Sequence, residues 1–318
     1  MCRASRLVES NYRLAAKVRD EYRRMAKPLA KLPTWSACCA VRSATCFTAE
    51  IHIKTQRLQA SCSLTFKVPI PTPMVLMLRP RSGARQWVMG EEYRLTPSVP
   101  AVEVNDSFGN LCQRLVAPVG EFAIYTSADV RVEALTPVDS DAPFVQVPML
   151  PSEVLEFLLP SRYCESDRFG DLATEIVGQS QPGYAQVVAI ADWVTRNIRN
   201  TPGSSTYPVS ATEVNKRGEG VCRDLAQISI ALCRALCIPA RLVVGYLHAL
   251  EPMDIHAWFE AYVGGEWCTF DPSSPQAKHP RIAIAHGRDS ADVAIYNQCG
   301  PLLLPTAMTV TVEKRDAP

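Results

Sequence analysis

The sequence has no long uninterrupted hydrophobic run and almost no net charge, and each shortage excludes a class of protein. The longest apolar stretch, residues 228–244, contains Arg234, Pro239 and Arg241, so it predicts a helix followed by a strand rather than a membrane span. The 33 Lys and Arg residues balance 32 Asp and Glu residues to a net charge of +1. That balance argues against nucleic acid or an anionic membrane as a partner. Charge runs through residues 1–30 and interrupts any apolar core of a secretory signal, so we expect a cytoplasmic protein.

The cysteines lack the spacing of a disulfide framework or a metal site. Twelve occur among 318 residues, and a reducing compartment with thiols packed as small hydrophobes is the simplest interpretation. Cys38, Cys39 and Cys46 lie close together, but no paired CxxC motif and no nearby histidine completes a tetrahedral ligand set. We therefore give a metal cluster at these cysteines little weight.

The composition predicts a folded protein of two domains behind a basic extension. Hydrophobic residues make up 47% of the chain and charged residues 20%, which is enough apolar surface for a substantial core. Residues 1–50 hold ten Lys and Arg against four Asp and Glu, so we separate residues 1–57 as an extension with a helix predicted over 13–31. A solvated, disordered or non-native tail is favoured there over an arm that binds nucleic acid or a membrane.

Short β-rich runs fill residues 58–135, the first predicted domain. They alternate with turns rich in Pro, Gly and Asn, which is typical of a small antiparallel sandwich. The predicted strands are 62–68, 75–78, 87–89, 93–96, 112–116 and 130–132. Residues 136–318 form the second predicted domain, which begins with a proline-rich connector and has helices predicted at 165–177 and 184–200.

The most informative segment is GEGVCRD at 218–224. Leu225, Ile228 and Leu232 recur at helical spacing after it, so Cys222 lies in the first turn of a predicted helix. The unpaired N–H groups and the positive dipole end of that turn favour a thiolate, the nucleophilic form of cysteine. Cysteine at such a position is more often a buried structural residue, so the assignment depends on its partners.

A β-hairpin with a glycine turn at 264–265 supplies those partners. A two-residue turn pairs Val263 with Glu266, and continuing that register brings Asp271 within a diagonal step of His256. A carboxylate beside an imidazole can orient the ring and stabilise its protonated form.

The sequence thus offers a nucleophile, a base and an orienting acid in the order Cys222, His256, Asp271. Together they predict acyl transfer through a thioester, in which the cysteine attacks a carbonyl and the histidine carries the proton. The backbone N–H of Cys222 is a candidate donor to the oxyanion. The competing interpretation is that the three residues are structural and never meet.

These residues stand in blocks that resemble the transglutaminase-like superfamily. The similar blocks are 218–224, 237–241, 245–247, 256–260 and 270–273, and the segment 287–293 resembles the one that follows the core in bacterial members. Residues 71–74 and 108–110 are similar to the amino-terminal β-domain of bacterial transglutaminase family proteins. The resemblance covers about residues 58–315.

The resemblance implies an α+β fold: a papain-like core, with a helix packed on an antiparallel sheet, preceded by a small antiparallel β-sandwich domain. It also implies catalysis by Cys222, His256 and Asp271 without a metal or organic cofactor. Superfamily members hydrolyse amide bonds, cross-link glutamine to lysine, or have lost activity. We favour hydrolysis of a peptide or protein substrate, because cross-linking requires a site that excludes water and admits a lysine. A protein-binding module with a vestigial core is the alternative from a different class.

Two further residues are candidates for supporting roles. Asp224, in the first helical turn beside Cys222, is explained by the helix dipole and is assigned support of the helix start. Trp258 lies two residues after His256 on the same strand face, where a wall of the substrate path and a plain core aromatic are equally favoured.

Overall fold

The computed structural model of the protein describes residues 55–83, 85–133, 140–274 and 279–315. These residues belong to one compact unit, His52–Pro318. The helix predicted at 13–31 and the cluster of Cys38, Cys39 and Cys46 lie outside the described residues. No helix in the described ranges is long and apolar enough to cross a membrane.

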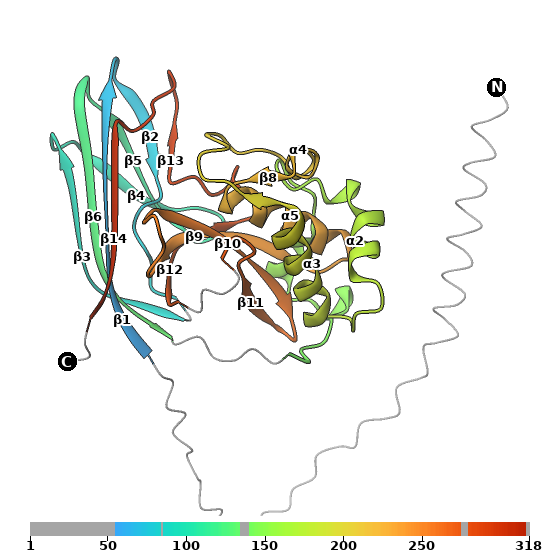
Figure 1. Ribbon diagram of the computed structural model, residues 1–318. Helices are drawn as coiled ribbons and strands as arrows, with labels where there is room; N and C mark the ends of the chain where they lie inside the picture. The colour runs from blue at the N-terminus through green and yellow to red at the C-terminus, as the bar shows by residue number, and fades with distance from the viewer. Residues whose placement is uncertain (1–54, 84, 134–139, 275–278, 316–318) are drawn as a thin grey trace, which may run out of the picture. The chain divides into compact units, whose positions relative to one another are not determined.

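Two four-stranded antiparallel sheets form the strand-rich part of the unit (Figure 1). The first has the order β14 (Ala307–Arg315), β1 (Thr55–Val68), β6 (Gly120–Glu133), β3 (Gln86–Thr96). The second has the order β13 (Tyr296–Gln298), β2 (Thr72–Leu76), β5 (Leu111–Ala117), β4 (Ala101–Asn105). Buried and more exposed residues alternate along β1, as expected when one face of a sheet is covered.

The strands predicted in this region are present, but their extents differ. The runs at 87–89 and 93–96 belong to the single strand β3, and the run at 130–132 is the end of the long strand β6. Strand β4 was not predicted, because all five of its residues are exposed and the alternation of Val102 and Val104 with polar neighbours is too short to stand out.

The last two strands pair with the strand-rich region rather than with the core sheet. Residues 296–315 were placed with the catalytic domain, yet β14 pairs antiparallel with β1 and β13 pairs antiparallel with β2. After the last strand of the core sheet, the chain therefore returns to the strand-rich region. Strand β1 pairs with β6 on one side and with β14 on the other, so neither of its edges is left unpaired.

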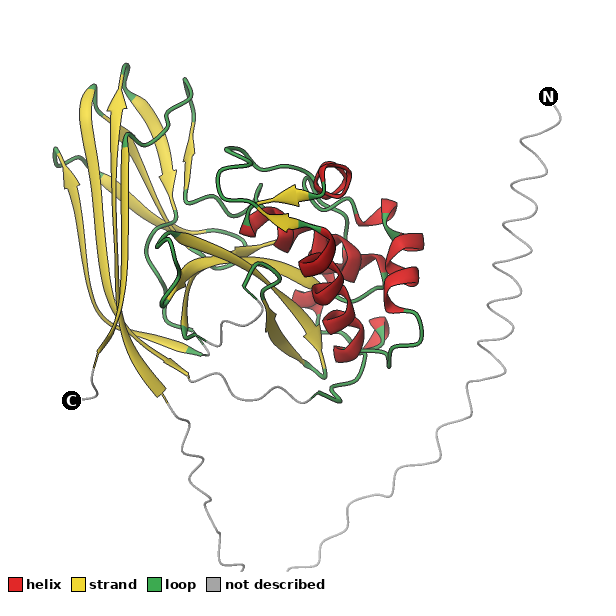
Figure 2. Ribbon diagram, in the orientation of Figure 1, coloured by secondary structure: helices red, strands yellow, loops and turns green. Residues whose placement is uncertain are grey.

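The core is a four-stranded antiparallel sheet covered by helices (Figure 2). Its order is β11 (Glu266–Phe270), β10 (Ile255–Val263), β9 (Ala240–Leu247), β12 (Arg281–Gly287). The α-helices are α2 (Gly170–Val177), α3 (Tyr184–Asn197), α4 (Ala211–Arg217) and α5 (Cys222–Ala235), and short 3-10 turns span Val147–Met149, Ser152–Leu158 and Ser166–Arg168.

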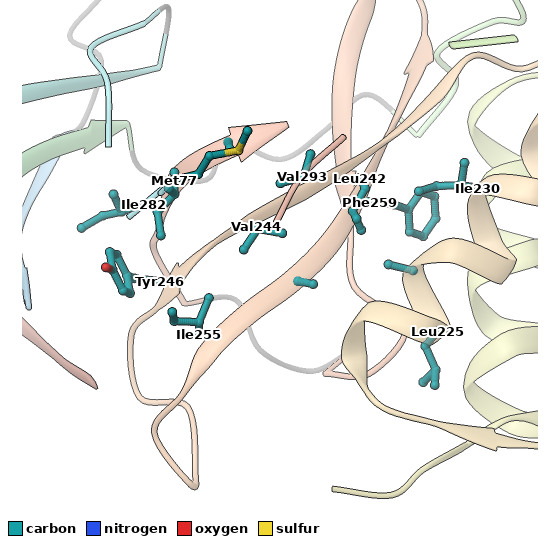
Figure 3. Close-up of a cluster of buried hydrophobic side chains, with 14 of the residues drawn as sticks. Met77, Leu225, Ile230, Leu242, Val244, Tyr246, Ile255, Phe259, Ile282 and Val293 are labelled. Carbon is teal, nitrogen blue, oxygen red and sulfur yellow. The ribbon is translucent and has the colours of Figure 1, made fainter. Parts of the chain in front are cut away.

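Helix α5 is the central helix of the core. Every residue from Asp224 to Arg234 is buried, because α5 packs on β9 and β10 and is flanked by α2, α3 and α4. Figure 3 shows Ile230 beside Phe259 on this face, whereas Tyr246 and Ile282 lie with Met77 farther along the sheet. The hydroxyl of Tyr246 donates to the Leu78 carbonyl at 3.2 Å, which joins the core sheet to the segment after β2.

The helix predicted over 184–200 ends earlier than expected. Helix α3 stops at Asn197, and β7 (Arg199–Asn200) pairs in parallel with β8 (Glu219–Gly220). Backbone bonds from the Arg199 and Thr201 N–H groups to the carbonyls of Gly218 and Gly220, both 2.9 Å, hold this pairing. The segment just before Cys222 is thereby fixed to the end of α3.

Two amide side chains cover the outer edge of β12. Gln86 donates to the Ala283 carbonyl at 2.8 Å and accepts from the Ala283 N–H at 2.9 Å. Asn110 makes the same paired contacts with the backbone of His286, at 2.8 and 2.9 Å. Each side chain replaces the hydrogen bonds that a neighbouring strand would supply. These bonds join the strand-rich region to the outer edge of the core sheet.

Candidate active site

Gly220 precedes α5 at a position where any side chain would force its neighbours to move. A Cβ atom on Gly220 would lie 2.7 Å from the Cβ of Asp224, which is closer than real carbon contacts allow. Cys222 is the first residue of α5 and is partly exposed. Its backbone N–H lies in the first turn, where no helical carbonyl precedes it as an acceptor.

Asp224 is fully buried and holds the entry to α5. Its Oδ2 accepts from the Val221 N–H at 3.1 Å and from the Ser205 hydroxyl. Arg223 donates to Asp224 Oδ1 at 3.2 Å and to the Tyr207 carbonyl at 3.0 Å. The structure therefore connects Asp224 to the helix start and to the loop before α4, in line with a supporting role.

His256 lies on β10 opposite Gly245 of β9 and is 3% exposed. A side chain at Gly245 would collide with the sheet, since a Cβ there would lie 2.0 Å from the Ile282 carbonyl oxygen and 2.8 Å from the Trp258 ring. The glycine allows β12 and Trp258 to approach the strand beside His256.

The hairpin register predicted from the glycine turn is confirmed. Val263 pairs with Glu266, and Gly264 and Gly265 have φ values of 64° and 90°, as a type I′ turn requires. At the other end of the hairpin, His256 Nε2 lies 2.8 Å from Asp271 Oδ2.

The Asp271 carboxylate is bonded through both oxygens. Oδ1 accepts from the Ser273 hydroxyl at 2.7 Å and from the Ser274 N–H at 3.2 Å. Oδ2 lies between His256 and Arg281, whose guanidinium is 2.9 Å away. Side-chain exposures of 4% for His256 and 3% for Asp271 make this a buried ionic network, in which each contact is strengthened by the low local dielectric.

Electrostatics favours an imidazolium next to an ionised carboxylate. Burial lowers the pKa of His256, but hydrogen bonds to Asp271 and Cys222 and their charges outweigh it and raise the pKa to about 9. Burial raises the pKa of Asp271, while His256, Arg281 and Ser273 act more strongly in the opposite direction and leave it below its usual value. The cysteine and the aspartate therefore both act on one ring.

Trp258 is a buried aromatic against His256. It is 2% exposed, and its ring stacks on the imidazole with centroids 6.3 Å apart and planes at 27°. This placement fits support of the histidine, and a role for Trp258 in lining the path of a substrate stays a prediction.

Arg281, at the start of β12, is the member of the network that sequence reasoning missed. It bonds Asp271, and its guanidinium carbon lies 5.5 Å from the centroid of the Trp258 ring. An arginine before a short apolar run has no local signature, so only the pairing of β12 with β9 could reveal it.

Comparison with known proteins agrees with this architecture. A family model of the transglutaminase-like superfamily matches residues 170–272. The solved structure of a "Putative Cysteine Protease" from Cytophaga hutchinsonii is 32% identical, with a TM-score of 0.78, over 83% of this chain and 92% of that one. The chain belongs to the transglutaminase-like superfamily. The predicted α+β fold class is confirmed, and the fold is that of papain-like cysteine enzymes.

Mycobacterial relatives of this transglutaminase-like chain are also found. Protein ML0607 of Mycobacterium leprae is 28% identical over 252 residues, which are 74% of this chain and 90% of the relative. Protein Rv2569c of Mycobacterium tuberculosis is 35% identical over 106 residues, which are 29% of this chain and 34% of the relative.

Proposed function

We propose that the protein is a cysteine-dependent enzyme that hydrolyses an amide bond in a peptide or protein. The observation that carries this proposal is the convergence of Cys222 and Asp271 on His256: the carboxylate bonds Nε2, and the Cys222 side chain acts on the same buried ring and helps to raise its pKa. Because Asp271 occupies Nε2, Nδ1 is the ring nitrogen left for the thiol. The resemblance to a structure described as a cysteine protease supports the same reaction class.

The first half of the proposed reaction forms a thioester. The Cys222 thiolate attacks the carbonyl carbon, and the oxyanion accepts a hydrogen bond from the Cys222 backbone N–H at the start of α5. His256 gives its proton to the amine nitrogen as the C–N bond breaks. The amine leaves, and the acyl group stays on sulfur.

The second half releases the acid. His256, now neutral, takes a proton from a water molecule as its oxygen attacks the thioester carbonyl. The C–S bond breaks, the carboxylic acid departs, and the thiolate–imidazolium pair is restored. Asp271 keeps its charge throughout, since its task is to orient the ring and stabilise the imidazolium.

We also propose a cytoplasmic location, because the irregular spacing of the twelve cysteines is not that of a disulfide framework.

Selective alkylation of Cys222 tests the proposed pair. We expect iodoacetamide to label Cys222 well below the pH at which free thiols ionise, and His256→Ala to remove that advantage. Labelled sites are identified by mass spectrometry of peptides. The exposed Cys237 and Cys299 serve as internal references in the same reaction. His248→Ala, which removes a histidine whose ring lies 6.0 Å from that of His279, is the matched control and leaves the labelling unchanged.

If Cys222 is labelled no faster than Cys237 and Cys299 at any pH, the proposed enzymatic activity is refuted. A protein-binding module with an inactive core would then be favoured. Where Cys222 is selectively reactive, incubation with an unfolded protein and a fluorescent primary amine separates the two reactions. We expect new peptides of lower mass without incorporated amine. Amine incorporation without cleavage would instead assign cross-linking to this site.

A further inference from the structure

Four side chains of the candidate site contact one another in a closed cycle. His256 bonds Asp271 at 2.8 Å, and Asp271 bonds Arg281 at 2.9 Å. The Arg281 guanidinium faces the Trp258 ring, which stacks on His256. This cycle of four side chains joins β10, the end of β11 and the start of β12, so three segments of the sheet meet at the Asp271 carboxylate.

The sharing of one oxygen is the decisive detail. Asp271 Oδ2 accepts from both His256 Nε2 and Arg281. The Ser273 hydroxyl and the Ser274 N–H hold the other oxygen. Three partners besides Arg281 therefore fix the position of the carboxylate. The distinctive contribution of Arg281 is its positive charge. The side chain is only 10% exposed, so water screens this charge little.

From this geometry, we propose that Arg281 is a positioning residue of the site, which acts on His256 by neutralising the carboxylate that the two residues share. This inference rests on the proposed function. A carboxylate without a counter-charge would bind the imidazolium proton too tightly, and a general acid must release its proton to the leaving amine. Arg281 thus balances the charge of the carboxylate that it shares with His256.

The charged groups around His256 come from every element packed against it. They are Cys222 from α5, Asp271 after β11, Arg281 from β12 and Asp254 just before β10. Glu260 of β10 acts on Arg281 rather than on the histidine. Of these groups, Arg281 is the cation that bonds the orienting acid.

The test compares two alkylating reagents across pH on the full-length chain. Iodoacetate carries a charge that a neighbouring imidazolium attracts, and iodoacetamide is neutral, so the ratio of their rates at Cys222 falls as His256 loses its proton. In Arg281→Gln, we expect the midpoint of that fall to move up by about one pH unit. Arg281→Lys, which keeps the charge, restores most of the wild-type profile. Arg281→Met keeps the stem on the Trp258 ring and serves if the Gln variant does not fold.

Arg241→Gln is the matched control. Arg241 makes an ion pair with Glu260 at 2.7 Å on the same sheet, with 18% and 16% of the side chains exposed, but bonds no residue of the proposed triad. It should lower thermal stability without moving the midpoint. A midpoint in Arg281→Gln that stays at the wild-type value, or falls, overturns the role of Arg281 alone. Wild-type Cys222 without selective reactivity would refute the proposed function itself.

Discussion

At the scale of single residues, the candidate site depends on one carboxylate with four partners. Asp271 bonds His256, Arg281, Ser273 and the Ser274 N–H. A buried charge with fewer partners would be costly, because desolvation is offset only when each oxygen is bonded. The aspartate can therefore remain ionised in a setting where burial alone would favour its neutral form.

Asp271→Asn should shift the titration of His256 in the direction opposite to that of Arg281→Gln. The carboxylate raises the pKa of His256 to about 9 against the lowering effect of burial. Without that charge, the midpoint of the iodoacetate-to-iodoacetamide rate ratio at Cys222 should fall by about two pH units. Ser273→Ala removes a contact with the other oxygen only and should move it slightly. An unchanged midpoint in Asp271→Asn would show that the acid does not control the histidine.

At the scale of elements, β12 is held in place by side chains of the strand-rich region. Gln86 and Asn110 bond the backbone of Ala283 and His286 along its outer edge. Because β12 begins with Arg281, this edge also sets the position of the guanidinium at Asp271. The strand-rich region is thus connected to the candidate site through hydrogen bonds between side-chain amides and the backbone of β12.

Asn110→Ala should lower the free energy of unfolding by about 2 kcal/mol, because the N–H and carbonyl of His286 lose their partners in a buried place. Asn110 is 4% exposed, so water replaces the amide poorly. Urea denaturation followed by circular dichroism measures the loss. Asn197→Ala is the control: Asn197 donates to the Trp193 carbonyl on an exposed helix surface, and its loss should cost at most about 0.5 kcal/mol. Equal losses in both variants would contradict the role of Asn110 at the edge.

At the scale of the whole described unit, the chain passes from the strand-rich region to the core and back. Strands β1 to β6 come first, the core follows, and β13 and β14 return to complete both sheets. Folding of the strand-rich region therefore requires segments from both sides of the core sequence. We expect the unit to unfold in a single cooperative step.

Two buried cysteines report on this step. Cys62 lies on β1 and Cys233 on α5, with exposures of 1% and 0%. Pulsed alkylation across a urea series should give both the same midpoint. Val310→Asp places a charge on the buried face of β14 opposite Cys62. It should destabilise the protein by about 3 kcal/mol and lower both midpoints together. Thr309→Asp, on the exposed face of the same strand, should change neither. Separate midpoints for the two cysteines would show independent folding.

Much of the candidate site was predictable because its geometry is local. Cys222 lies in the first turn of α5 because glycines precede an apolar helical pattern. The approach of His256 to Asp271 follows from a two-residue glycine turn, which fixes the register of every pair in the hairpin. The α+β class follows likewise from the order of periodic segments.

The sequence by itself therefore determined the elements that carry the proposed nucleophile, base and acid, since periodicity and turn geometry act over a few residues. Only the tertiary structure decided that Arg281 bonds Asp271, that Asn110 covers β12, and that β14 pairs with β1. These contacts join residues far apart in the chain, as with the 176 positions between Asn110 and His286. No local pattern encodes them, because which distant segments meet depends on how the apolar faces of all the elements are buried together.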